Sequence, residues 1–153
     1  MSQKFPLQTL LDLSRHRSEA AVQKLGQLNQ QQQMEQKKLE KPLQFRREYH
    51  ARYLEISSRG MDHHAMMNFQ EFLTRLDEAV GQQKKIMDQA SRSVEQGRVE
   101  VQETQRSKKS FDTLAQRHAA TVLESETRVD RKIQDEQSRQ FAARGADLTG
   151  DNS

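Results

Sequence analysis

The sequence contains no cysteine and no tryptophan, and it has only two prolines and six glycines in 153 residues. Without cysteine, the chain forms no disulfide and offers no cysteine-based metal site or nucleophile. Sandwiches, barrels and α/β domains need frequent turns, and so few prolines and glycines argue against all three. No apolar run approaches the roughly 18 residues of a membrane span, and the N-terminus lacks the apolar region of a signal peptide. We therefore expect a soluble, cytoplasmic protein.

Apolar residues are also scarce: 33% of the residues are hydrophobic and 31% are charged. Average globular domains are about 45–50% apolar and about 25% charged. The residues that are abundant, namely Gln, Glu, Lys, Arg, Ala and Leu, are good helix formers. A chain of helix formers without the material for a wide core is typical of long, thin helices.

The second half of the chain repeats every seven residues, with apolar side chains at the first position (a) of the repeat. The a positions are Leu73, Val80, Met87, Val94, Val101, Lys108, Ala115, Val122 and Val129. The d positions are Phe69, Leu76, Gln83, Ala90, Gly97, Thr104, Phe111, His118 and Ser125. Nine heptads in register indicate a left-handed coiled coil, and β-branched residues at a favour two strands.

The first half follows alternating spacings of four and three residues. The positions are Leu7, Leu11, Ser14, Ser18, Ala21, Leu25, Leu28, Gln32, Glu35, Leu39, Pro42, Arg46, Tyr49, Tyr53 and Ile56. The apolar pattern is weak between residues 32 and 46, and we expect a kink at Pro42 because proline lacks the helical donor.

A single turn is predicted at residues 57–62, where Gly60 suits a left-handed cap and Asp62 suits the start of the next helix. Two helices joined by one turn predict an all-α fold, a long antiparallel two-helix coiled-coil hairpin over residues 1–144. Helix one spans about 7–56, the longer helix two spans about 63–140, and residues 145–153 are a disordered tail. Charge supports pairing of the two arms, since residues 1–60 carry a net charge of +5 and residues 61–153 a net charge of −2.

The unequal helix lengths leave part of helix two without a partner. At 1.5 Å per residue the helices extend about 75 Å and about 115 Å, and residue 7 lies opposite about residue 112. The apolar stripe nevertheless continues through Val122 and Val129. Such a stripe indicates a surface that binds another protein; the alternative is a fraying end, or an end packed against the first few residues.

Large apolar side chains are also in excess near the turn, because Phe45 and Phe72 fall outside the seam. With Tyr49, Leu76 and Ala79 they predict a partly exposed cluster, which is typical of binding anchors. The alternative is a core widened locally by the Pro42 kink.

Catalytic and metal-binding patterns are not found. Adjacent residues His63 and His64 point about 100° apart on a helix, and His16, His50 and His118 match no metal-site spacing. Isolated glycines form no phosphate loop, and the paired lysines and arginines are scattered around the helices rather than gathered for nucleic acid. We expect no enzyme activity, no cofactor, no metal and no nucleic-acid partner.

Three segments resemble members of the FliJ family. They are Pro6 to Leu13 at the start, Asn68 to Leu73 with Leu76, Ala79 and Val80 at the opening of helix two, and Glu126 to Glu136 near the end. The resemblance covers about residues 5–145, with matching length and hairpin position. It implies a cytoplasmic component of the flagellar type III export apparatus, folded like the central stalk (gamma) subunit of rotary ATP synthases.

The resemblance also implies partners. They are the export ATPase FliI, bound at the centre of its hexameric ring, FliH, the export gate protein FlhA and the substrate-specific export chaperones, all at the cytoplasmic face of the inner membrane. Ring contact is implied for Val122, Arg128, Val129, Asp130, Lys132 and Asp135, and gate contact for Phe45, Tyr49, Phe72, Leu76 and Ala79. The alternatives are a homodimeric coiled-coil scaffold and the stalk protein of a virulence type III secretion system.

Overall fold

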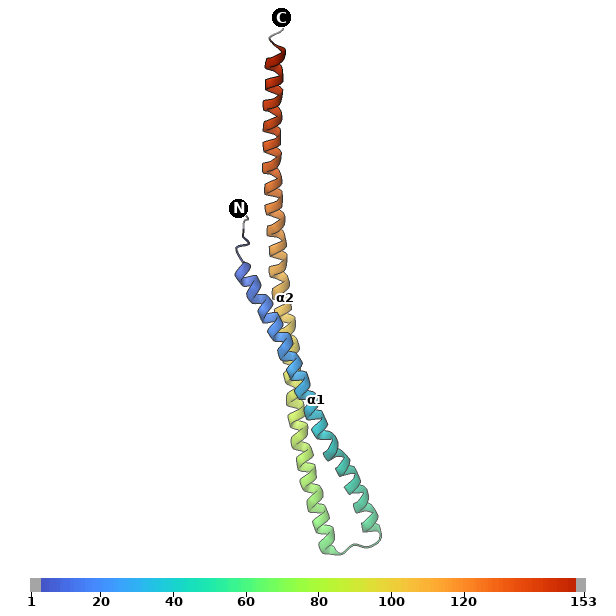
Figure 1. Cartoon of the computed structure of the whole chain (residues 1–153). Coiled ribbons are helices and arrows are strands. Elements are labelled where there is room, and N and C mark those ends of the chain that lie inside the picture. Colours follow the sequence, from blue (N-terminus) through green and yellow to red (C-terminus); the bar gives the residue numbers. More distant parts are fainter. Residues whose placement is uncertain (1–3, 151–153) are drawn as a thin grey trace. The chain divides into compact units, whose positions relative to one another are not determined.

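A computed structural model describes residues 4–150, which form two helices joined by a short turn (Figure 1). Helix α1 spans Gln8–Ser58 and helix α2 spans His63–Thr149, and these residues contain no strand. The predicted all-α hairpin is confirmed.

The second helix is longer than the sequence predicts. We placed its end near residue 140 and a disordered tail from residue 145, but α2 continues to Thr149. Ala142, Ala143 and Ala146 are strong helix formers that support this extension. Residues 151–153 of the predicted tail lie outside the described part of the chain.

The turn occupies residues 59–62 and is built as its sequence suggests. Gly60 has a φ of 90°, which glycine adopts without a steric cost, and its amide donates to the Ser57 carbonyl. The Asp62 carbonyl accepts the first bond of α2, from the Met66 amide at 2.9 Å.

The chain packs as two units. The turn unit comprises residues 16–105, and the terminal unit comprises the two chain ends, of which residues 4–15 and 106–150 are described. In each unit a segment of α1 runs antiparallel to a segment of α2. The sequence analysis treated residues 1–144 as one hairpin and did not anticipate this division.

The seam of the turn unit follows the heptad positions read from the sequence. Ala21, Leu73, Val80 and Val94 are buried, and the remaining seam positions in residues 16–105 are buried or half-buried, except exposed Ile56. On α1 the a positions count from Leu11 and the d positions from Ser14, in steps of seven. Burial of one apolar stripe from each helix is what holds this unit together.

The middle of the seam is polar. Gln83 Nε2 donates to a carboxylate oxygen of Glu35 at 2.7 Å and to the Glu35 carbonyl at 3.0 Å. Gln32 Nε2 donates to the Ser91 hydroxyl at 3.0 Å. Hydrogen bonds thus replace apolar contact where the sequence pattern is weakest, and α1 continues through Pro42 without ending.

In the terminal unit, Leu11 and Ser14 are buried, and Phe5 contacts His118 with ring centroids 5.5 Å apart. The sequence analysis placed residue 7 opposite about residue 112, so the pairing reaches further along α2 than we expected. The predicted pairing is offset because we counted residues on both sides of Gly60, whereas α2 begins three residues later, at His63.

From Leu123 to Gly150 every residue of the terminal unit is exposed (orange to red in Figure 1). We call residues 123–149 of α2 the overhang. None of the helices in residues 4–150 carries an apolar stretch long enough to cross a membrane.

Candidate protein-docking surfaces

Four aromatic rings meet between the helices near the turn. The Tyr49 ring lies 4.7 Å from Phe72 and 6.0 Å from Phe69, and the Tyr53 ring lies 5.7 Å from Phe69, measured between centroids. Tilted ring pairs at these separations are favourable, at about 0.5–1.5 kcal/mol each beyond the area they bury. We call these rings, with Phe45, the aromatic cluster.

The aromatic cluster is part core and part surface. Tyr49 and Leu76 occupy d positions of the seam and are half-buried, whereas Phe45 is 48% exposed and Phe72 is 44% exposed. Ala79 is exposed as well. The five residues predicted for gate contact therefore divide into two in the seam and three beside it.

The three exposed members share one side of the turn unit. Phe45, Phe72 and Ala79 all occupy g positions of the heptad, which flank the seam on one side. Lys24 and Glu100 are also g residues, and the 3.4 Å separation of Lys24 Nζ and Glu100 Oε2 shows that the g positions of the two helices face each other. We call this side of the turn unit the g flank.

Two shallow grooves border Tyr49. One, of about 300 Å³, is lined by Tyr49, Ala65, Asn68, Phe69 and Phe72. The other, of about 390 Å³, lies along α1 and is lined by Phe45, Glu48, Tyr49, Ala51, Arg52 and Glu55. Grooves with aromatic walls are suited to accept an apolar side chain from a partner.

The end of α2, comprising Val122 and the overhang, presents the second predicted surface. Val122 is half-buried in a groove that also includes Phe5 and His118, and Val129 is 53% exposed. Sequence reasoning missed Ile133, which is 48% exposed and follows Val129 by four residues, and Phe141, which is 82% exposed. The helical spacing from Val129 to Ile133 was a signal that the heptad count overlooked.

The charged residues predicted beside Val129 do not share one face. Arg128, Lys132 and Asp135 follow helical spacings of four and three residues, whereas Asp130 falls on the far side of the helix. Arg128 is paired with Glu124 at 2.7 Å. The structure thus separates Asp130 from the other three.

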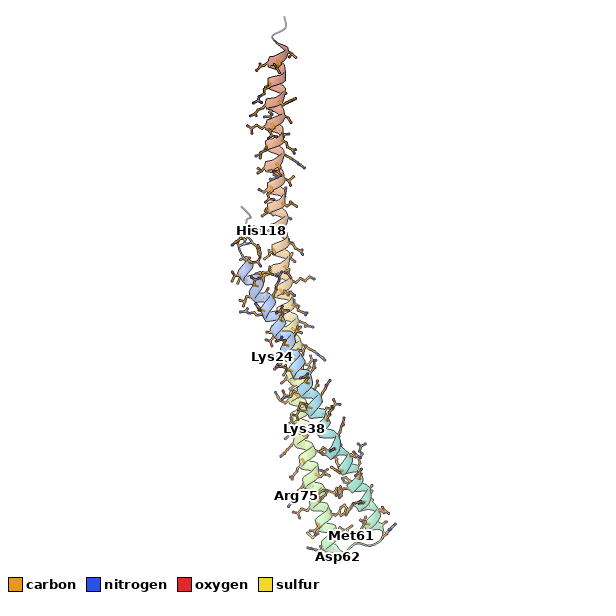
Figure 2. The ribbon with its side chains drawn as sticks, viewed as in Figure 1. Lys24, Lys38, Met61, Asp62, Arg75 and His118 are labelled. Atoms are coloured by element: carbon orange, nitrogen blue, oxygen red, sulfur yellow. The ribbon has the colours of Figure 1, made fainter. Side chains whose placement is uncertain are left out.

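Histidine and carboxylate groups gather nowhere as metal ligands: residues 4–150 contain no cluster of three or more that is placed to hold an ion. His63 and His64 are exposed at the start of α2. His118, labelled in Figure 2 beside the N-terminal end of α1, is packed against Phe5, and its Nε2 atom is buried.

Comparison with known proteins assigns the chain. A family model described as "Flagellar FliJ protein" matches residues 3–146. The chain belongs to the FliJ family. Two proteins called "Flagellar FliJ protein", from Escherichia coli (strain K12) and Salmonella typhi, are each 27% identical to it over 146 residues, covering 95% of this chain and 97% of each relative.

The fold agrees with a solved structure. A YscO homolog, CT670 from Chlamydia trachomatis, superimposes with a TM-score of 0.73 at 19% identity and covers 99% of this chain and 100% of its own. Membership of the FliJ family makes the chain a component of the flagellar type III export apparatus. Of the alternatives left open by the sequence, the family match therefore favours the flagellar one.

Proposed function

We propose that this FliJ-family protein acts as a stalk in the export apparatus, joining the export ATPase to the export gate. The overhang, with Val122 at its base, enters the centre of the FliI hexamer and promotes its assembly and activity. The gate protein FlhA is contacted by Phe45, Tyr49, Phe72, Leu76 and Ala79. FliH and the export chaperones are further partners, and the protein works at the cytoplasmic face of the inner membrane.

The observation that carries this proposal is the overhang. Residues 123–149 form a continuous helix whose side chains are all exposed, including Val129, Ile133 and Phe141. Apolar residues held on an unpaired helix are typical of a surface that another protein covers. A single helix of 27 residues, which is about 40 Å long, is narrow enough for the opening of a ring.

The mechanism is mechanical and allosteric. One asymmetric helix inside a six-fold ring cannot touch all six subunits equally. Each contact stabilises one conformation of the subunit it touches, and a ligand shifts a conformational equilibrium by its difference in affinity for the states. Unequal contacts thus bias nucleotide turnover from subunit to subunit.

The ring contact is tested by ATP hydrolysis and hexamer assembly of the cognate FliI, measured with and without the protein. Stimulation of both is expected. Replacing Val122 and Val129 with Asp removes the stimulation and leaves helicity by circular dichroism unchanged, because Val129 is 53% exposed and half-buried Val122 lies within the continuous helix α2. The control is Gln134→Asp, an exposed position on another face of the overhang, and full stimulation by the double valine variant overturns the ring assignment.

The gate contact is tested by Phe72→Ala. We expect weaker binding to purified FlhA and a loss of stability of about 2 kcal/mol, from the ring contact with Tyr49 and the buried part of the Phe72 side chain. Met67→Ala, which removes a side chain that is 55% exposed and off the g flank, is the control. A large fall in melting temperature with binding retained shows instead that Phe72 is a core residue.

A further inference from the structure

The groove that lies between the two helices and is lined by Tyr49, Ala65, Asn68, Phe69 and Phe72 has a counterpart further along the turn unit. This second groove also has a volume of about 300 Å³ and is lined by residues of both helices: Leu28, Gln31, Glu35, Lys85, Ile86, Gln89, Ala90 and Ser93. We call the first of these two grooves, which contains Phe69 and Phe72, the turn-side groove, and its counterpart the mid-coil groove.

The residues that line the turn-side groove recur in the mid-coil groove at a fixed spacing. Every α2 residue of the turn-side groove has an equivalent 21 positions later: Ala65 and Ile86, Asn68 and Gln89, Phe69 and Ala90, Phe72 and Ser93. On α1, Leu28 lies 21 positions before Tyr49. Because 21 residues are three heptads, both grooves open on the g flank, about 32 Å apart along α2.

Local packing explains the mid-coil groove. Ala90 is a small residue at a d position, and the facing position on α1 is Glu35, whose carboxylate is held by Gln83. The seam is therefore underfilled at this point, and Leu28 and Ile86 line the space. Ile86 has a large apolar side chain at a g position, and this side chain is 49% exposed.

On α2 the g flank is apolar from Phe72 to Ile86, whereas on α1 it is mixed. Phe45 and Ala79, both exposed g residues, lie between the two grooves in sequence register, and so does Lys38, an exposed g residue that pairs with Glu35 at 3.3 Å. Beyond the mid-coil groove, the ion pair of Lys24 and Glu100 crosses the flank and ends its apolar character. The opposite flank carries exposed polar residues at its e positions, among them Gln36, Lys84 and Arg98.

We propose that one amphipathic partner helix of at least three heptads lies along the g flank and places an apolar side chain in each groove. Two equivalent grooves one whole number of heptads apart match the repeat of a third helix packed against a coiled coil. The inference rests on the proposed function, because the turn-side groove belongs to the surface assigned to the gate protein. The inference adds that the contacting part of the gate protein is a helix, and that the contact extends along α2 as far as Ile86.

The grooves differ enough to set the direction of the partner helix. The residues that line the turn-side groove are uncharged, whereas Glu35 and Lys85 border the mid-coil groove. A partner side chain that enters the mid-coil groove therefore meets charged neighbours, and one that enters the turn-side groove meets aromatic walls. A helix laid in the reverse direction would exchange these surroundings.

Binding of purified FlhA to two matched variants tests the extension. Ile86 and Val99 are both 49% exposed on α2, but Val99 occupies an f position, away from the g flank. Ile86→Asp weakens binding about tenfold or more, as expected for the loss of a central apolar anchor, and Val99→Asp leaves it unchanged. Equal effects of the two substitutions overturn the proposal.

Site-specific cross-linking tests the helix itself. A photoreactive p-benzoylphenylalanine is placed at Asn68, at Gln89 or, as the control, at Lys84 on the opposite flank. We expect the first two to label a single FlhA segment at points about 21 residues apart, and Lys84 to label none. Labels on separate segments, or on one segment at a spacing that no helix spans, overturn the proposal.

The outcomes also separate this inference from the proposed function. If Phe72→Ala and the Asn68 cross-link report gate contact while Ile86→Asp and the Gln89 cross-link do not, the gate contact stands and the extended helix is wrong. If none of them reports contact with FlhA, the gate assignment itself is wrong.

Discussion

A β-carbon at position 97 would lie 3.0 Å from Cδ1 of Leu28 and 3.3 Å from Cδ1 of Leu25. Gly97 is buried at a d position, so α1 packs directly over the backbone of α2 at this point. A glycine inside a helix destabilises it by about 1 kcal/mol relative to alanine. Glycine is nevertheless required at this position, because the neighbouring leucines occupy the space that a side chain would fill.

Gly97→Val should therefore lower the free energy of unfolding by about 1–3 kcal/mol, the range for overpacking a core. Gly81→Val is the matched control, because a β-carbon there meets no atom within 4 Å. Chemical denaturation followed by circular dichroism measures both. Equal stabilities of the two variants would show that the helices do not approach closely at Gly97.

Glu35 makes the stability of the turn unit depend on pH. The amide of Gln83 that donates to its carboxylate lowers the pKa of Glu35; burial opposes this shift, and Lys38 adds to it. Because the pKa is lower in the folded state, this contribution is present above the ordinary glutamate range and is lost as the pH falls through the folded value.

Removing the Gln83 amide should raise that pKa. In Gln83→Leu the Glu35 carboxyl titrates at a higher pH than in the parent protein, as measured by carbon NMR of the side-chain carboxyl group. Gln82→Leu, at an exposed neighbouring position, should leave the titration unchanged. An unchanged midpoint in Gln83→Leu would contradict the assigned cause.

His118 holds a buried polar atom against an aromatic ring. Its Nε2 has no hydrogen-bond partner among the described residues, and its ring packs on Phe5. A buried polar group left unpaired costs about 1–3 kcal/mol. His118→Leu should therefore strengthen the packing of residues 4–15 on α2, seen as slower amide hydrogen exchange in residues 11–15, and faster exchange there would contradict this account.

The ion pair between Lys24 and Glu100 reports the antiparallel register. Both side chains are about half exposed, so the pair contributes at most about 1 kcal/mol. Lys24→Glu alone should destabilise the protein slightly, and adding Glu100→Lys should restore stability at low salt. The restoration should fade in 1 M salt because of screening, and its absence at low salt would place these residues apart.

The candidate surfaces were only partly predictable. Phe45 and Phe72 stood out because they fall outside the seam, and both are exposed. The mid-coil groove was not predicted, although Phe72, Ala79 and Ile86 follow one another at intervals of seven residues. An exposed g position is recognisable in the sequence, but a groove depends on how far the facing helix fills the space beside it.

The sequence by itself determined the two helices, the turn at Gly60 and the residues of the seam. Each of these follows from local rules, namely helix propensity, a seven-residue apolar period and a glycine that accepts a positive φ. Tertiary structure alone decided the pairing of Phe5 with His118, the tilted ring contacts of Tyr49 with Phe69 and Phe72, and the grooves of the g flank. These features arise from contacts between residues far apart in the chain, where the volumes of facing side chains set the register and the spaces left open.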